Sequence, residues 1–323
     1  MIMKKTACFF VIALAIVCAR AQAPALNLPA WNATVTVLDE AGQPVAGADV
    51  GMSYYVPPPS GENEASDKIH GLTDTNGIVR LTHANTGSIG LGLQVSKTGY
   101  YPTTQGHEFA KFQDNDPAKW NPTITLVLKK IGKPIAMYAK KEETKTPKEN
   151  EAIGFDLMIG DWILPYGTGK TADILFTVHR KITSQQEFDA DLKLTFPNVG
   201  DGVVVVPPAP DTGSPLVMPR PAPEGGYQAE RQWRYHNFSE RPESVLGYFF
   251  RVRTVLDENG NVKSALYGKI QGDVRFLVGT KAPRAGIAFD YYLNPTPNSR
   301  NVEFDPKQNL FQGLPFDEQV KAP

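Results

Sequence analysis

Short runs in which apolar and polar residues alternate recur along the whole chain, and this period of two predicts β-strands. In the first half the predicted strands are residues 33–38, 45–55, 69–73, 78–82, 88–97 and 122–130, with one more near 105–112. In the second half they are residues 153–159, 172–180, 187–196, 226–235, 245–256, 262–278 and 287–293. The pattern predicts an all-β protein with two domains, an N-terminal β-sandwich and a larger C-terminal β-sandwich or partly open barrel.

Three turns of the form Asp-x-x-Gly separate predicted strands, starting at residues 39, 74 and 257. In such a turn the Asp side chain accepts from backbone N–H groups two residues on, while Gly takes the positive φ that closes the bend. The third turn predicts a hairpin in which Asp257 pairs with Asn261 and Gly260 occupies the left-handed position.

The register of this hairpin follows from its turn. It pairs Leu256 with Val262, Thr254 with Ser264, and Val252 with Leu266. One face of the hairpin is then mostly apolar, and the other carries Arg251, Arg253, Lys263 and Lys269.

A resemblance to a known family is carried by the first two turns and their flanking strands. Residues 35–50 read VTVLDEAGQPVAGADV and residues 73–77 read TDTNG. This arrangement resembles the carboxypeptidase-regulatory-like, or transthyretin-like, β-sandwich of many secreted bacterial proteins. The resemblance implies a fold rather than an activity, because such modules occur beside many activities and alone. One class with this topology hydrolyses a purine-derived ring with His, Arg and a C-terminal Tyr-Arg-Gly-Ser motif, which is absent here.

The second half resembles segments of exported bacterial proteins whose chemistry is not established. The matching segments read GKTAD at 169–173, ALYGKI at 265–270, YYLNP at 291–295 and RNVEFDP at 300–306. This resemblance implies secretion and no particular reaction.

Shifts in composition predict the domain organisation. The expected segments are a signal peptide at 1–21, the regulatory-like sandwich at 31–131, a charged connector at 132–151, a second β-rich domain at 152–311 and a tail at 312–323. The connector is expected to be solvated, because residues 140–149 are charged and nearly free of apolar groups. The proline-rich stretch 206–225 is expected to be a long surface loop.

The first 21 residues have the features of a secretory leader. Lys4 and Lys5 precede an apolar run that is too short to cross a bilayer as a helix, and Ala19 and Ala21 place the expected cleavage after Ala21. A lipid anchor on Cys18 is disfavoured, because Val17 before it is not a small residue. The sequence therefore predicts a secreted or periplasmic protein with no transmembrane segment in the mature chain.

Composition narrows the expected partners further. The two cysteines lie in the leader, so a mature chain without it would have neither disulfide nor thiolate metal ligand. A formal net charge of −1 gives no reason to expect nucleic acid as a partner. Gly and Pro together make 55 of 323 residues (28 + 27), which favours turn-rich β structure over helices.

Candidate catalytic motifs are weak. The segment Gly167–Thr171 lacks the first glycine of a phosphate-binding loop, because residue 164 is Leu. The five histidines show no metal-ligand spacing, so no metal or cofactor is expected. Paired carboxylates could support glycoside hydrolysis. The nearby pairs are Asp156 with Asp161, Asp189 with Asp191, and Glu303 with Asp305.

Polar residues near the C-terminal end form the candidate ligand site. A Pro-fixed loop at 294–306 carries amides, an arginine and carboxylates that could bind a sugar or a cation. The basic face of the hairpin could contact a polyanionic glycan. The candidate residues are Asn294, Arg300, Asn301, Glu303, Asp305, Arg251, Arg253 and Tyr267.

The function expected from these features is an exported, non-enzymatic binding or structural module for carbohydrate or a partner protein at the cell envelope. The alternative is a secreted polysaccharide-acting hydrolase that uses paired carboxylates of the C-terminal domain.

Overall fold

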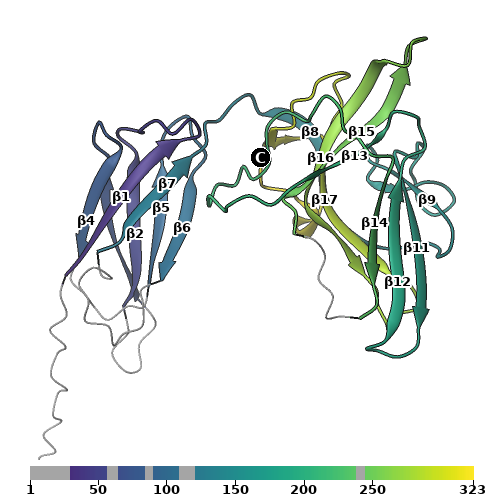
Figure 1. The fold of residues 1–323 in the computed structure, drawn as a ribbon, viewed down its shortest axis with the longest axis horizontal. Coiled ribbons are helices and arrows are strands. Elements are labelled where there is room, and N and C mark those ends of the chain that lie inside the picture. The colour runs from purple at the N-terminus through teal and green to yellow at the C-terminus, as the bar shows by residue number, and fades with distance from the viewer. Residues whose placement is uncertain (1–29, 57–64, 84–89, 109–120, 238–243) are drawn as a thin grey trace, which may run out of the picture.

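The all-β class predicted from the sequence is confirmed. The structure is a computed structural model, and it describes residues 30–56, 65–83, 90–108, 121–237 and 244–323. In these ranges the regular elements are β-strands, apart from one 3₁₀ turn, η2 (Phe316–Glu318), and loops and turns connect them. Figure 1 shows two β lobes joined by crossing segments. The predicted leader lies outside the described residues, and within them no helix is long and apolar enough to cross a membrane.

The first lobe is a sandwich of two open sheets. One has the strand order β4-β1-β7 and the other β3-β2-β5-β6. The first sheet comprises β1 (Trp31–Asp39), β4 (Ile78–His83) and β7 (Thr123–Leu128). The second comprises β2 (Asp49–Val56), β3 (Ala65–Leu72), β5 (Gly90–Ser96) and β6 (Thr103–Glu108). Alternate residues of these strands, such as Val35 and Val37 of β1, fill one apolar core.

The Asp-x-x-Gly turns close as their chemistry predicts. Asp39 Oδ1 accepts from Ala41 N and Gln43 N, both at 2.9 Å, and Asp74 Oδ1 accepts from Ile78 N at 2.9 Å. Gly77 has a φ of 73°, and a Cβ there would collide with a carbonyl oxygen of β1. Only glycine therefore fits the end of that turn.

The second lobe packs a five-stranded sheet against a six-stranded sheet. Their strand orders are β10-β9-β11-β12-β14 and β13-β15-β16-β17-β8-β18. The first contains β9 (Ile153–Asp156), β10 (Asp161–Trp162), β11 (Ile174–Ile182), β12 (Phe188–Thr195) and β14 (Glu230–Tyr235). The second contains β8 (Ile135–Lys145), β13 (Gly202–Val206), β15 (Gly247–Leu256), β16 (Val262–Leu277), β17 (Gly286–Asn294) and β18 (Phe304–Asn309).

The core between these two sheets is aromatic. Phe155 contacts Trp162, Phe289 and Tyr291 edge-on, with ring centroids 5.4, 5.7 and 6.3 Å apart. Buried aromatic rings supply large apolar area and favour such edge-to-face pairs. This cluster joins β9 to β17 and holds the two sheets face to face.

The expectation that residues 132–151 form a solvated connector is wrong for most of that segment. Residues 135–145 form β8, which pairs antiparallel with β17 and parallel with β18. Met137 and Ala139 are fully buried, and the charged residues 140–145 pair with residues 286–291 of β17. A strand inside a sheet needs only one apolar face, and β8 alternates more buried with more exposed positions.

The hairpin of β15 and β16 follows the predicted register at its two ends. Leu256 pairs with Val262 and Val252 with Leu266. Between them, Ser264 pairs with Val255 instead of Thr254, because a bulge interrupts the ladder.

The hairpin also corrects the predicted basic face, because Lys269 is fully buried. Lys269 lies on a second apolar cluster that covers the outer face of the six-stranded sheet. The cluster also takes Met218 from the proline-rich stretch, Val302 from the loop before β18, and Val320 from the tail. Since these segments shield that face, the sheet is buried on both sides. The polar residues of an alternating strand in this sheet are therefore not necessarily exposed.

Candidate functional site

Glu303, one of the predicted ligand residues, lies at the joint between the lobes and is only 1% exposed. Its Oε1 accepts from Tyr101 Oη at 2.7 Å and Gly132 N at 2.9 Å. Its Oε2 accepts from Lys133 N at 3.0 Å and lies 3.5 Å from Arg220 Nε. Both carboxylate oxygens are therefore used within the protein, and Glu303 connects the start of β18 to the first lobe.

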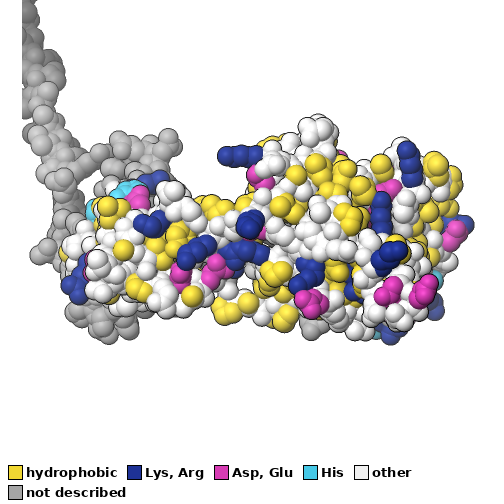
Figure 2. Space-filling view, turned by 90° about the horizontal axis from the view of Figure 1, so that it is seen from above, with side chains coloured by type: hydrophobic (Ala, Val, Ile, Leu, Met, Phe, Trp, Pro, Cys, Tyr) yellow, Lys and Arg dark blue, Asp and Glu magenta, His cyan; other side chains and the backbone are white. Residues whose placement is uncertain are grey.

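Arg220 extends this joint along the proline-rich stretch. Its Nη1 and Nη2 donate to the two carboxylate oxygens of Glu40, at 2.8 and 3.0 Å, and Nη2 also donates to Lys130 O. Nearby, Lys129 Nζ donates to Leu216 O at 2.7 Å. Figure 2 shows basic and acidic side chains together along the face between the lobes. The proline-rich stretch is thus a loop that also binds the first lobe, through Arg220 and the carbonyl oxygen of Leu216.

The Tyr101 hydroxyl donates a hydrogen bond to the Glu303 carboxylate. Burial and the adjacent Glu303 carboxylate raise the pKa of Tyr101, so its hydroxyl keeps its proton. The joint is therefore held by a charge-assisted hydrogen bond.

Substitution of Glu303 by Ala should lower the free energy of unfolding by about 2–3 kcal/mol, because buried donors and Arg220 would lose their acceptor. Asp305→Ala, two residues further along the chain, is the matched control. Asp305 is partly exposed, and among the described residues it accepts from Lys307 N and Gln308 Nε2, so its loss should cost below about 1 kcal/mol. Urea unfolding of the two variants measures the difference, and equal losses would contradict this role for Glu303.

Asn294 and Asn301 hold the loop before β18 in place. The fully buried Asn294 accepts from Thr296 N at 2.9 Å, and its Nδ2 donates to Asn301 O at 2.8 Å. Asn301 Nδ2 donates to Lys133 O at 2.7 Å. These amides satisfy backbone groups of the loop, as Asn commonly does in turns.

Arg300 connects the same loop to the proline-rich stretch. Its Nη1 donates to Ala222 O at 2.7 Å, and its Nη2 contacts Glu224 Oε1 at 2.8 Å. The guanidinium therefore binds a segment of this chain.

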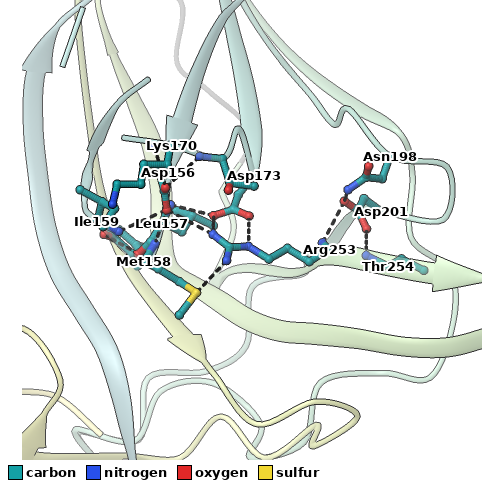
Figure 3. Close-up of polar contacts among 12 residues, drawn as sticks. Asp156, Leu157, Met158, Ile159, Lys170, Asp173, Asn198, Asp201, Arg253 and Thr254 are labelled. Atoms are coloured by element: carbon teal, nitrogen blue, oxygen red, sulfur yellow. Dashed lines mark hydrogen bonds and ion pairs between the residues drawn. The ribbon is translucent and has the colours of Figure 1, made fainter. Parts of the chain in front are cut away.

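Arg253 leaves β15 toward two carboxylates of the facing sheet (Figure 3). Its Nε donates to Asp173 Oδ1 at 2.7 Å, and its Nη2 to Asp173 Oδ2 at 3.0 Å and Asp156 Oδ1 at 3.2 Å. The side chains of Asp156 and Asp173 are 3% and 0% exposed. One cation thus compensates two buried carboxylates between the two sheets.

The electrostatics of the two carboxylates differ. Burial raises the pKa of Asp173, although Arg253 opposes this. Burial acts the same way on Asp156, but four backbone N–H donors outweigh it and hold the pKa of that carboxyl below its usual value.

Two of those donors are the amides of Lys170 and Thr171, each 3.0 Å from Asp156 Oδ2. The Gly167–Thr171 segment therefore does bind an anion, and the anion is a side chain of the same protein.

Arg251 on β15 is opposite Tyr267 on β16, which is in turn opposite Asn294 on β17. The Arg251 guanidinium lies 4.6 Å from the centroid of the Tyr227 ring, and Arg251 Nε donates to Gly200 O at 2.7 Å. The rings of Tyr227 and Tyr267 are 6.2 Å apart. Three of the eight predicted residues thus share one row across neighbouring strands, the others lie elsewhere, and ligand binding by any of them stays a prediction.

A polar hollow of about 420 Å³ lies on the outer face of the five-stranded sheet. It is lined by Asn150, His179, Arg180, Lys181, Asp189, Ala190, Asp191, Arg234 and His236. Asp191 of β12 is opposite His179 of β11 and Arg234 of β14. The two aspartates share one face, as predicted, and Asp189 Oδ1 lies 2.6 Å from His236 Nδ1. Each aspartate therefore lies among basic groups.

An apolar cleft of about 510 Å³ lies at one end of the second lobe. It is lined by Phe188, Tyr235, Asn237, Asp273, Val274, Arg275, Phe276, Leu277, Val278 and Gly279. The rings of Tyr235 and Phe276 pack against each other in its wall, with centroids 6.0 Å apart. Clefts of this size with apolar walls and few polar groups are typical ligand sites.

The cleft lies where two strands lose their neighbours. β15 begins at Gly247, opposite Gln271, so within the described ranges the rest of β16 has no strand on that side. β14 is the last strand of the other sheet. Two strand edges therefore flank the cleft, and such edges carry backbone groups that can pair with another chain.

Asp273 is the carboxylate of the cleft. Its Oδ1 accepts from Trp233 Nε1 at 2.9 Å and from Tyr248 Oη at 2.5 Å. Burial and this carboxylate raise the pKa of Tyr248, so its hydroxyl stays a donor. Both bonds end on Oδ1 and fix the orientation of the Asp273 carboxylate. Neither of them involves the second carboxylate oxygen, Oδ2.

Sequence reasoning missed the cleft, although one signal for it was present. Residues 262–278 are long for a single strand, and Gly272-Asp273 interrupts the apolar alternation in its middle. Glycine inside a strand often marks a bulge. The structure has an irregularity between Gln271 and Arg275, and Asp273 lies within it.

Comparisons with known proteins assign no family to this chain. No protein-family model matches the chain, and no curated protein is significantly similar to it. Among solved structures, a 3-chlorocatechol 1,2-dioxygenase from Rhodococcus opacus 1CP is 16% identical over 32% of this chain, at a TM-score of 0.25. The match covers 61% of that enzyme, less than two thirds of its length.

Two pilins are also similar. A single-residue mutant of the shaft pilin SpaA from Lactobacillus rhamnosus GG is 12% identical over 55% of this chain and 90% of its own, at a TM-score of 0.23. A streptococcal ancillary pilin is 12% identical over 68% of this chain and 52% of its own, at a TM-score of 0.20. At such TM-scores these likenesses carry no information on function.

Proposed function

We propose that the chain is an exported, non-enzymatic binding module, and that its apolar cleft binds an extended segment of a partner protein. The observation that carries this proposal is the position of the cleft between the edges of β14 and β16. Export rests on the features of residues 1–21.

The lining of the cleft favours a protein segment over a sugar. Phe188, Tyr235 and Phe276 offer an apolar space that suits an aliphatic or aromatic side chain, whereas the hydroxyls of a sugar would lose water there. Asp273, held by Trp233, supplies one acceptor for a donor beside that side chain.

The strand edges supply the second half of the recognition. An extended peptide that pairs with an edge gains main-chain hydrogen bonds, and its alternate side chains enter the neighbouring pocket. The cleft therefore matches a β-strand whose inward residue is apolar.

The test is selection of peptides on the mature chain, residues 22–323, followed by calorimetric titration of a selected peptide. Tyr235→Ala removes one wall of the cleft and should weaken binding about tenfold or more. The matched control is Arg234→Ala, because Arg234 is next on the same strand and belongs to the polar hollow on the opposite face. No selected peptide, or an equal effect of both variants, would overturn the proposal.

A second candidate function is glycan binding in the polar hollow. It is favoured by the charged and amide groups on one sheet face, of which His179, Asp191 and Arg234 form one row across three strands. In that case a glycan panel gives the positive result, Arg234→Ala abolishes it, and Tyr235→Ala leaves it intact.

A further inference from the structure

Two charged residues line the described part of the apolar cleft, Asp273 and Arg275. The Arg275 guanidinium lies 3.9 Å from Glu143 Oε2 on β8, so it has a partner of opposite charge. Asp273 instead accepts from two neutral donors, Trp233 Nε1 and Tyr248 Oη. These two bonds orient the Asp273 carboxylate but bring no positive charge to it.

An irregularity in β16 places Asp273 beside the cleft. Between Gln271 and Arg275 the pairing of β16 with β17 shifts register, and Gly272 has a φ of 76° there. Bulges often re-aim a side chain next to a functional site. In this one, the Asp273 side chain reaches Trp233 of β14, which belongs to the facing sheet. The carboxylate therefore connects the two sheets at the edge of the cleft.

The donors that hold Asp273 are themselves packed in place. The Arg231 guanidinium lies 5.8 Å from the centroid of the Trp233 ring and 5.9 Å from that of Tyr248. A cation at this distance from an aromatic face stabilises the arrangement. The orientation of Asp273 thus rests on contacts within the protein, and a ligand that binds a preorganised group loses less free energy in ordering it.

The walls of the cleft suit the stem of a long basic side chain. Val274, next to Asp273, is fully buried, and the rings of Tyr235 and Phe276 pack against each other in the wall. Lysine and arginine bury their methylene stems along apolar surface while the charged head keeps a polar partner. Apolar walls around one oriented carboxylate meet both needs of such a side chain.

Other side chains would meet only one of these needs. A neutral hydroxyl or amide could donate to Asp273, but a hydrogen bond with an ionised donor is stronger. An acidic side chain would be repelled by the carboxylate. An aliphatic side chain would remove water from it without replacing the lost hydrogen bonds. The chemistry of the cleft therefore favours a cation at this position.

We propose that Asp273 makes the cleft select partner segments that carry a lysine or an arginine two residues from their apolar anchor. This inference rests on the proposed function, in which an extended segment pairs with a strand edge beside the cleft. In such a segment, residues two apart point to the same face and lie about 7 Å from each other. One packs against Phe188, Tyr235 and Phe276, and the other pairs with Asp273.

The experiment starts from the peptides selected on the mature chain, residues 22–323. Lysine or arginine should be enriched two positions from the apolar anchor. The tightest such peptide is then made in three forms, with lysine, glutamine or norleucine at that position, and each is titrated calorimetrically. We expect the glutamine and norleucine forms to bind about tenfold more weakly than the lysine form, because the charge pair is lost. Added salt should weaken only the lysine form.

Asp273→Asn assigns this difference to one carboxylate. Asparagine keeps an oxygen for Trp233 and Tyr248, so the variant loses the charge and retains an acceptor for both donors. The three forms should bind this variant with equal affinity. Glu187→Gln is the matched control, because it removes one negative charge beside Phe188 at an exposed position outside the lining, and it should keep the tenfold difference.

The outcomes separate this inference from the proposed function. Selected peptides that lack an enriched basic residue, and that bind wild type and Asp273→Asn equally but Tyr235→Ala weakly, would overturn the selectivity and leave the cleft as a peptide site. No selected peptide would overturn both. Should Asp273→Asn fail to fold, the three forms on the wild-type chain decide, and a lysine form no tighter than the norleucine form overturns the role of Asp273.

Discussion

Lys269→Met is expected to raise the free energy of unfolding at pH 7 by about 3 kcal/mol, because an ionisable amine that loses its water on burial costs free energy that an apolar side chain of similar volume does not. The side chain is fully buried, beside the Tyr292 ring and within the field of the Glu303 carboxylate. Methionine fills the same space without the cost of removing an amine from water. The lost hydrogen bond to Pro323 O offsets only part of this gain.

The pH dependence of stability identifies the cause of this effect. The folded pKa of Lys269 is about 7 against an ordinary value of 10.5, so between these values the unfolded chain binds more protons than the folded chain. The free energy of unfolding of the wild-type chain should therefore rise between pH 7 and 9, by up to about 1.4 kcal/mol per pH unit from this group. Lys269→Met should lose that rise.

Urea unfolding of both chains at pH 6, 7, 8 and 9 measures the prediction. The prediction would be wrong if the variant were less stable than wild type at pH 7 and its free energy of unfolding rose as steeply between pH 7 and 9. That result would show that the Lys269 amine is charged and well compensated in the folded protein.

Arg253→Ala is expected to lower the free energy of unfolding by about 3–5 kcal/mol, since it leaves Asp156 and Asp173 buried without their cation. Arg253 connects β15 to the facing sheet, so its substitution also removes a contact between the two sheets at this point (Figure 3). Its backbone stays fixed by Asp201, whose Oδ2 accepts from Arg253 N at 3.1 Å.

The matched control is Arg251→Ala, two residues earlier on the same strand. Arg251 loses one hydrogen bond and the contact with Tyr227, which together should cost about 1 kcal/mol. The deficit of Arg253→Ala should shrink as the pH falls toward 4, because burial raises the pKa of Asp173 and protonation removes its charge. Equal losses at all pH values, or equal losses in the two variants, would mean that Arg253 acts through packing alone.

Features that depend on neighbours in the chain were predicted correctly. The turns at Asp39, Asp74 and Asp257 close with the hydrogen bonds that an Asp side chain makes to amides two and four residues on. Both ends of the hairpin register follow from the third turn. Such contacts span a few residues, so the residue types alone specify them.

The polar residues of the candidate site were recognised as distinctive, but their partners were not. Glu303 binds Tyr101, which is 202 positions away, and Arg253 binds Asp173, 80 positions away. A spacing of two in the sequence shows that Glu303 and Asp305 lie close along the chain, but not that one is buried at a joint and the other partly exposed.

The alternation of apolar and polar residues was enough to establish an all-β chain with its tight turns, because strand period and turn chemistry are local properties. Only the tertiary structure decided that residues 135–145 enter a sheet, that Lys269 is buried beneath the tail, and that a cleft opens where β15 begins. Each of these depends on which segments cover the second face or the edge of a sheet. Burial is a property of the assembled layers, and one strand carries the same side chains whether its outer face meets water or another part of the chain.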